Sequence, residues 1–241
     1  MIISIINQKG GVAKTTSTFN LGSILAKQGK RVLLIDIDPQ NSLTTSFNLL
    51  SEKSMFDVMC NNENIKNIIL KVSENLFLAP SNLDLSVAEL QLINVMAREN
   101  VLKKNLNKIE NDFDIILIDC PPSLSLLTIN SLVSSDEVIV PVATDFLSYK
   151  GLELLLDTIE KVKNNLNENL AIKGVIATMY DGRTNHSNEV LKVLKNDFTV
   201  LGVIKSSVIV KDSIMANEPL ITFAPNHETT KEYLKIAKEI K

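Results

Sequence analysis

The stretch Asn7–Thr16, with the sequence NQKGGVAKTT, constrains this chain more than any other. It follows an apolar run at residues 2–6, which predicts a short buried strand. It precedes residues 17–27, whose apolar side chains recur at helical spacing. A strand, a glycine-rich turn and a helix N-terminus together leave backbone N–H groups unpaired and directed at an incoming anion. The stretch therefore predicts a phosphate-binding loop.

The residue types in this loop suit ATP with a bound magnesium ion. Gly10 and Gly11 have no Cβ, so the backbone can turn sharply and approach phosphate closely. Lys14 offers a positive charge to the β- and γ-phosphates, and the Thr15 hydroxyl can ligate Mg²⁺. The residues expected to contact the nucleotide are Lys9, Gly10, Gly11, Val12, Ala13, Lys14, Thr15 and Thr16.

The loop departs from the common phosphate-loop pattern G-x-x-x-x-G-K-[ST] at both glycines, where Gln8 and Ala13 stand instead. The pattern that fits is K-G-G-x-x-K-[ST], which starts with an additional lysine, Lys9. If the backbone at Ala13 needs a positive φ, its Cβ costs on the order of 1 kcal/mol.

This pattern resembles the deviant Walker A motif of the ParA/MinD branch of P-loop ATPases. The resemblance implies that Lys9 reaches across a dimer interface to the nucleotide of the other subunit. The branch tolerates alanine at the position of Ala13, so we expect a working loop. The alternative, a glycine-rich turn before an ordinary helix, does not explain why strand, turn and helix occur together.

Apolar runs of strand length alternate with helical patterns along the whole chain. We expect strands at 2–6, 30–35, 76–80, 115–118, 137–142, 172–178 and 199–204, and helices at 17–27, 83–110, 149–166, 184–196 and 228–240. Continuously apolar strands alternating with helices predict an α/β fold, a mostly parallel twisted sheet with helices on both faces. No repeat, low-complexity block or convincing linker interrupts this pattern, so we expect one P-loop domain over residues 1–241.

Composition limits the classes of protein to which the chain can belong. Its net charge of −3 excludes a globally basic DNA-binding protein, so any DNA surface would be a local patch, doubled by dimerisation. Cys60 and Cys120 are too few for a disulfide framework, and His186 and His227 stand alone, which disfavours a metal site built from residues alone. We expect a cytoplasmic protein, because there is neither a signal peptide nor an apolar run near the ~20 residues of a membrane span.

Acidic residues follow two of the expected strands. Asp36 and Asp38 come directly after one, in DIDPQ, and Asp119 follows the apolar run 115–118, in DCPPS. Ligands of such folds bind at the carboxyl ends of parallel strands, where the phosphate loop also lies. A carboxylate after a buried strand is the Walker B arrangement, which directs an acid at the Mg²⁺ shell.

With these motifs, the resemblance to the ParA/Soj partition ATPases covers nearly the whole chain. The matching segments are NQKGGVAKTT, VLLIDIDPQNSLTTS, LAPSNLDL, DFDIILIDCPPSLSLLTINSL, VIVPVATDFLSYKGLELL and ATMYDGRTNHSNEV. The resemblance implies that Asp38 positions or activates the attacking water and that Asp119 orders the Mg²⁺ shell through water. Thr16 would help to hold the α-phosphate, and Pro121–Ser123 would form a switch. Asp36 either bonds the loop or supports Mg²⁺ and the P-loop.

The resemblance implies a weak ATPase, with Lys9, Lys14 and Asp38 as its catalytic residues. Binding of Mg-ATP would drive a sandwich homodimer that binds DNA without sequence preference, on the nucleoid. A ParB-like centromere-binding partner would stimulate hydrolysis and so release the DNA. Because the chain starts at the first strand, without a helix-turn-helix extension, we do not expect it to bind an operator specifically.

The match weakens after residue 200, where many relatives carry two arginines. Ser206 and Ile209 occupy those positions here, and the nearby lysines cannot reproduce a bidentate arginine contact. Arg183 does stand where relatives have an arginine, and it either contacts DNA or braces a loop. The candidate DNA-binding residues are Arg183, Lys205, Lys211 and Lys235.

A membrane-associated positioning ATPase like MinD is the main alternative. It would need a basic amphipathic helix at the C-terminus. Residues 228–241 include three glutamates, so a helix packed on the core is the preferred interpretation, and no membrane partner is expected. An iron–sulfur reductase would need cluster cysteines, whereas Cys120 stands inside the DCPPS motif. A scaffold without activity does not fit the complete set of loop and acidic residues.

Overall fold

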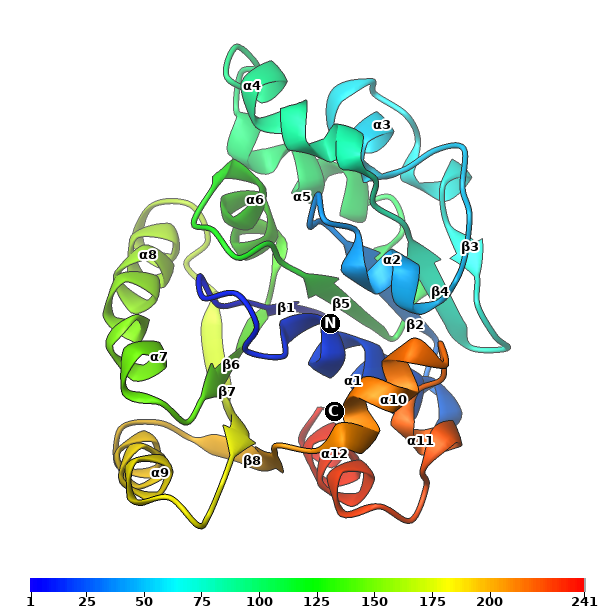
Figure 1. Cartoon of the computed structure of the whole chain (residues 1–241). Coiled ribbons are helices and arrows are strands. Elements are labelled where there is room, and N and C mark those ends of the chain that lie inside the picture. Colours follow the sequence, from blue (N-terminus) through cyan, green and yellow to red (C-terminus); the bar gives the residue numbers. More distant parts are fainter. Residues whose placement is uncertain (241) are drawn as a thin grey trace.

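Eight strands form one sheet in the computed structural model, which describes residues 1–240 (Figure 1). The strands are β1 (Ile2–Ile5), β2 (Val32–Asp36), β3 (Leu70–Lys71), β4 (Leu76–Ala79), β5 (Ile115–Asp119), β6 (Glu137–Ala143), β7 (Ala171–Tyr180) and β8 (Val200–Lys205). Their order across the sheet is β3-β4-β2-β5-β1-β6-β7-β8. The β3–β4 pair is antiparallel and the other neighbouring pairs are parallel, which confirms the predicted fold class.

Helices connect the strands and cover both faces of the sheet (Figure 1). The α-helices are α1 (Lys14–Lys27), α2 (Ser42–Ser46), α3 (Met55–Cys60), α4 (Ala88–Leu92), α5 (Val101–Leu106), α6 (Leu126–Ser134), α7 (Phe146–Lys150), α8 (Leu152–Asn165), α9 (Asn185–Asp197), α10 (Val208–Met215), α11 (Leu220–Phe223) and α12 (Glu228–Glu239). Short 3-10 turns lie at η1 (Ile65–Asn67), η2 (Leu83–Val87), η3 (Arg98–Asn100) and η4 (Glu110–Asp112). Within residues 1–240, none of the helices combines the length and apolarity needed to cross a bilayer.

The sheet separates two hydrophobic cores, because successive side chains of a strand point to opposite faces. In the β1 segment, Ile2 and Ile6 pack with α3, α5, α6, α8 and α9, whereas Ile3 and Ile5 pack with α1, α11 and α12. Each buried isoleucine or leucine contributes roughly 1.5–3 kcal/mol. Burial on both faces explains why the central strands are apolar throughout.

The central strands bring the predicted motifs to one edge of the sheet. β5 lies between β1 and β2, and Asp119 is in register with Ile5 on one side and Asp36 on the other. The glycine-rich loop leaves the carboxyl end of β1, next to the ends of β2 and β5. The three motifs therefore converge.

The last helix, α12, packs into the core as the sequence predicted. Tyr233 and Ile236 are fully buried, and the Tyr233 hydroxyl shares a 3.2 Å hydrogen bond with the Ser17 hydroxyl of α1. The apolar face of α12 thus packs against α1 and β8.

The predicted helix over 83–110 is wrong. This segment is divided into η2, α4, η3 and α5, and Ala97 adopts a left-handed conformation with φ 53° that interrupts the helical hydrogen bonding. The apolar residues of this segment were expected to share one buried face, but they do not: Leu85 is buried, whereas Leu83 and Leu90 are mostly exposed. The predicted helix over 149–166 is also divided, at Gly151, into α7 and α8.

Candidate nucleotide site

The loop after β1 turns at two residues with positive φ, Gly11 at 75° and Ala13 at 68°. A Cβ added at Gly10 or Gly11 would meet nothing within 4 Å, so open space lies above the loop. Ala13 adopts the left-handed conformation that the sequence analysis considered, at a cost of roughly 1–2 kcal/mol for a residue with a Cβ. The chain holds this strained residue at the N-cap of α1.

The N-terminus of α1 has the properties of an anion site. Its N-cap residue, Ala13, makes no side-chain capping bond, and no acidic residue stands in its first turn. The backbone N–H groups of that turn therefore lack helical partners, and the helix dipole adds positive potential there. A phosphate group placed against the loop would satisfy both features.

Lys14 lies beneath the loop with only 7% of its surface exposed. Its Nζ donates a 3.1 Å hydrogen bond to the Lys9 carbonyl oxygen. Burial lowers the pKa of the Lys14 ammonium, and the nearby Asp119 carboxyl, when ionised, opposes this effect. A desolvated cation held by a neutral carbonyl can form a stronger, charge-assisted bond with a phosphate oxygen.

Thr15 and Asp119 form a pair of oxygen ligands beside the loop. Thr15 Oγ1 donates to Asp119 Oδ2 at 2.7 Å, and Thr18 Oγ1 donates to Asp119 Oδ1 at 3.2 Å. Burial, together with the adjacent Asp36 carboxyl, raises the pKa of Asp119 to about 8. A nearby cation favours the charged form of such a carboxyl, and hydroxyl and carboxylate oxygens are ligands that Mg²⁺ prefers. These residues therefore fit a magnesium ion shared with phosphate oxygens.

Asp36 braces the loop after β2. Its Oδ2 accepts bonds from the Thr44 backbone N at 2.8 Å and the Thr44 hydroxyl at 2.7 Å, and its Oδ1 accepts from Asp38 N at 3.2 Å. Burial raises the pKa of Asp36 to about 7. Of the two roles left open for Asp36, these contacts favour bonding the loop.

Asp38 stands at the wall of the cavity that faces the phosphate loop. Its Oδ1 accepts a 2.9 Å bond from Gln40 N, and its carbonyl oxygen accepts a 2.8 Å bond from the Ser81 hydroxyl. The side chain is thus fixed at the site where the sequence analysis expected a residue that aligns water.

One cavity of about 770 Å³ joins the loop to a region that the sequence analysis missed. Its loop end is lined by Gly10, Gly11, Ala13, Lys14, Thr15, Thr16 and Asp38. Its far end is lined mainly by residues from the ends of β7 and β8, from α10 and from the turns on either side of α10. They are Met179, Ile204, Ser206, Ser207, Val210, Ile214 and Asn217. A signal for these residues existed, because they lie at or after the carboxyl ends of two predicted strands, at the same edge as the other motifs.

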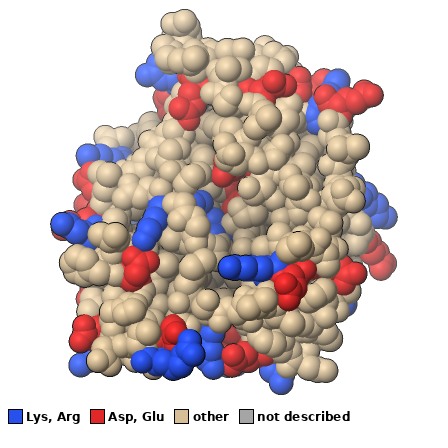
Figure 2. Space-filling view, viewed as in Figure 1, with Lys and Arg blue, Asp and Glu red and all other residues tan. Residues whose placement is uncertain are grey.

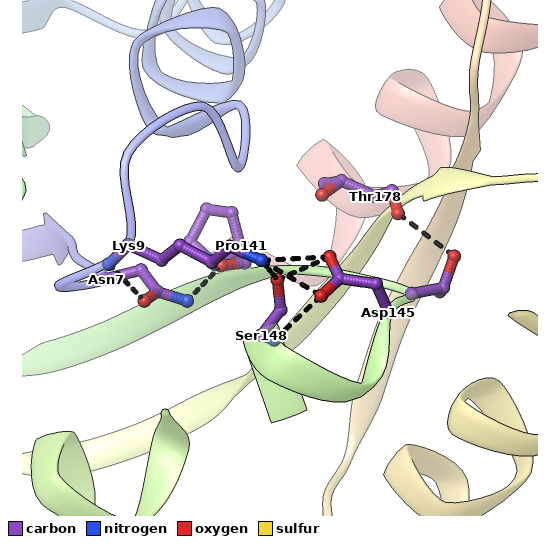
Figure 3. A network of polar contacts seen from close by, with 7 residues as sticks. Asn7, Lys9, Pro141, Asp145, Ser148 and Thr178 are labelled. Atoms are coloured by element: carbon purple, nitrogen blue, oxygen red, sulfur yellow. Dashed lines mark hydrogen bonds and ion pairs between the residues drawn. The ribbon is translucent and has the colours of Figure 1, made fainter. Parts of the chain in front are cut away.

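Lys9 does not lie in this cavity. Its ammonium reaches Asp145 and Ser148 at the start of α7 (Figure 3). About 38% of the Lys9 side chain is exposed to solvent.

The four candidate DNA-binding residues do not form one basic patch in the single chain. Arg183, Lys205 and Lys235 each pair with a carboxylate of the same chain, and Lys205 and Lys211 line the nucleotide cavity. Figure 2 shows lysine and arginine interspersed with aspartate and glutamate on the face that carries the loop.

Known proteins match this chain over most of its length. A family model described as an AAA domain matches residues 1–172. The chain is 40% identical to the sporulation initiation inhibitor protein Soj of Bacillus subtilis over 246 residues, which cover 99% of this chain and 97% of that protein. It is 37% identical to the chromosome-partitioning ATPase Soj of Treponema pallidum over 239 residues, which cover 98% and 94%.

A solved structure with a bound nucleotide also matches the chain. The Mycobacterium smegmatis protein named cobyrinic acid a,c-diamide synthase, with a bound ATP analogue and magnesium, matches with a TM-score of 0.84 and 34% identity, over 98% of this chain and 92% of that one. Its name describes that protein, whereas the two relatives reported above, with 40% and 37% identity, are both named Soj. The protein is an ATPase, with ATP and magnesium as its ligands. Since these relatives match nearly from end to end, the chain belongs to the ParA/Soj family of partition ATPases.

Proposed function

We propose that this protein segregates DNA through a cycle of dimerisation. Mg-ATP binding joins two copies in a sandwich dimer, the dimer binds DNA without sequence preference, and a ParB-like centromere-binding partner stimulates hydrolysis, which releases the DNA. The protein would work in the cytoplasm, on the nucleoid. The observation that carries this proposal is the position of Lys9, which adjoins the phosphate loop but does not line the nucleotide cavity, and whose ammonium bonds Asp145 instead. An ammonium in this position serves a second subunit better than its own.

Four residues at or beside the loop end of the cavity have defined roles in this proposal. Lys14 and the N–H groups at the start of α1 bind the phosphates, and Thr15 and Asp119 hold the metal shell, Asp119 through water. When bound by these residues, magnesium would neutralise charge on the phosphates. Asp38 aligns the attacking water from the opposite wall.

The far end of the cavity suits the nucleoside. Met179, Ile204 and Val210 offer apolar surface to the base, and the nearby hydroxyls and the Asn217 amide offer hydrogen bonds. A mostly apolar pocket with a few polar groups is typical of small-molecule sites, and the volume lies within their usual range of ~300–1,000 Å³.

The proposed DNA surface combines Arg183, Lys205, Lys211 and Lys235 from two copies. Three of these side chains pair with carboxylates on the surface, and such exposed pairs are worth only about 0–1 kcal/mol. Exchanging a carboxylate for a DNA phosphate therefore costs little. Contacts to phosphates carry no direct sequence information, so binding would be non-specific.

The test is whether retention of DNA in a mobility assay requires ATP. Wild-type protein should shift DNA with Mg-ATP and not without nucleotide. Lys14→Ala should lose the shift because it binds ATP poorly, which is measured separately with a fluorescent ATP analogue. A shift of equal size with and without ATP would contradict the proposed cycle, and unchanged ATP affinity in Lys14→Ala would contradict the role of Lys14.

A further inference from the structure

The ammonium of Lys9 is held by three acceptor atoms at the start of α7 (Figure 3). Lys9 Nζ donates to Asp145 Oδ1 at 2.9 Å, to Asp145 Oδ2 at 3.1 Å and to Ser148 Oγ at 2.7 Å. A lysine ammonium has three donors, so this arrangement satisfies all of them within one chain.

The backbone around Lys9 is fixed to the same part of the sheet. Asn7 Nδ2 donates to the Pro141 carbonyl at 2.7 Å, and Asn7 Oδ1 accepts from Lys9 N at 2.9 Å. Gln8 Nε2 donates to the Gly151 carbonyl at 2.6 Å. The entrance of the phosphate loop is thus bound to the segment that runs from β6 through α7.

Asp145 combines its contact with Lys9 with a second task. It is the N-cap of α7, and it accepts bonds from Ser148 N at 2.9 Å and from the Ser148 hydroxyl at 2.7 Å. Partial burial alone would raise the pKa of Asp145, but the bonds from Ser148 and Lys9 outweigh it and lower the pKa. The carboxylate is therefore negatively charged at neutral pH, opposite the Lys9 ammonium.

We propose that Asp145 and Ser148 are positioning residues for Lys9, which hold its ammonium on its own chain until a second subunit with bound nucleotide competes for it. This inference rests on the proposed function, because it takes the nucleotide of the second subunit as the destination of Lys9. Formation of the dimer then breaks two such intramolecular ion pairs, one in each chain.

Lys14 connects this ion pair to the phosphate site. Its ammonium bonds the carbonyl oxygen of Lys9 itself. When Lys14 turns to a phosphate oxygen, the Lys9 carbonyl loses that bond, while the Lys9 N–H stays bonded to Asn7. Nucleotide binding therefore removes one of the bonds that fix the Lys9 backbone in the chain that has bound the nucleotide.

The strength of the ion pair suits reversible release. The Lys9 and Asp145 side chains are 38% and 41% exposed, so the pair belongs to the weak, salt-sensitive class. Removing one such pair should change an equilibrium by roughly 1.4- to 5-fold. Because each dimer breaks two pairs, the dimer dissociation constant should change by the square of that factor, about 2- to 30-fold.

The test uses Asp145→Asn in the full chain. Asparagine is as good an N-cap as aspartate, so α7 should keep its cap while Lys9 loses its charged partner. Glu153→Gln is the matched control, because Glu153 is an exposed acid just past α7 for which no bond to Lys9 occurs in residues 1–240. The dimer dissociation constant is measured by sedimentation with magnesium and a non-hydrolysable ATP analogue, at low and high salt.

We expect Asp145→Asn to dimerise about 2- to 30-fold more tightly than wild type at low salt, with a smaller gain at high salt. Ser148→Ala should show a smaller gain, and Glu153→Gln none. An unchanged or weakened dimer in Asp145→Asn would overturn the inference, as would a gain that Glu153→Gln shares. Lys9→Ala distinguishes failure of the proposed function from failure of this inference. If Lys9→Ala dimerises like wild type, the proposed role of Lys9 in the dimer is wrong. If Lys9→Ala fails to dimerise but Asp145→Asn has the dissociation constant of wild type, only the holding role of Asp145 is wrong.

Discussion

Thr15 Oγ1 donates a 2.7 Å hydrogen bond to Asp119 Oδ2, and this bond joins the first turn of α1 to the end of β5. The two residues lie 104 positions apart in the chain. Their oxygens are already adjacent in the folded chain, so the proposed magnesium site requires little rearrangement.

Replacing Thr15 by alanine should therefore affect both stability and metal binding. Asp119 is fully buried and would lose its shortest hydrogen bond, which should lower the free energy of unfolding by about 1–3 kcal/mol. ATP binding should also depend less on magnesium. Urea unfolding without nucleotide measures the first effect, and Thr16→Ala is the control, because no hydrogen bond of the Thr16 hydroxyl occurs in residues 1–240. Equal stability of the two variants would contradict this role of Thr15.

A substitution at the strained loop residue Ala13 should raise stability instead of lowering it. Ala13 has φ 68°, a conformation that glycine adopts without the Cβ penalty. Ala13→Gly should raise the stability of the folded chain by up to ~1 kcal/mol, the relief of strain less the extra entropy that glycine gives the unfolded chain. Thermal unfolding measures this change. Ala26→Gly, inside α1, is the control and should lower stability by about 0.5–1 kcal/mol. A loss of stability in Ala13→Gly would mean that the αL conformation here costs nothing.

The sequence predicted the central sheet well, for a physical reason. β2 and β5 are buried on both faces, so every position must be apolar until the strand ends in its acid, Asp36 or Asp119. Such a run has few other interpretations. The same logic places the acids at one edge, in register with each other.

The segment over 83–110 could not be predicted in this way. Its apolar residues recur at spacings that fit a helix, but Leu85 and Leu92 pack in the core while Leu83 and Leu90 do not. Which of them is buried depends on the packing of α3 and α6, which no local pattern contains. The left-handed Ala97 likewise has no signal in a chain where alanine usually favours helix.

Ion pairs were equally invisible in the sequence. Lys205 bonds Glu228, which lies 23 residues away, and Lys9 bonds Asp145, which lies 136 residues away. The sequence located the charges, but only the fold decides which of them are already paired.

Charge reversal at Lys211 tests the proposed DNA surface. Lys211→Glu should weaken DNA binding equally on unrelated sequences, and it should lower the slope of log affinity against log salt by about one unit for each phosphate that the lysine neutralises. Because Lys211 also lines the nucleotide cavity, ATP affinity must be measured in the same variant. Lys104→Glu in α5 is the control of equal charge on an exposed lysine distant from α10. A loss that depends on the DNA sequence would contradict a role in binding phosphate.

The last prediction concerns Asp38, whose proposed role is separate from binding. In the proposed site Lys14, Thr15 and Asp119 provide the groups that bind phosphate and metal, and Asp38 lies on a different loop, after β2. Replacing it by alanine should therefore leave ATP and magnesium bound, while turnover falls by the ~10²–10⁴-fold typical of a lost acid–base group.

Dimer formation in the proposed cycle depends on bound ATP and not on its cleavage. Asp38→Ala should consequently remain dimeric and leave DNA more slowly than wild type, even when the partner is present. The measurement is the rate of DNA dissociation after ATP is chased with ADP. Asp38→Asn serves as a second variant, because its amide oxygen can still accept the bond from Gln40 N that holds the loop. If both variants leave DNA as fast as wild type, or neither binds ATP, then Asp38 supports the loop after β2 and does not act on the attacking water.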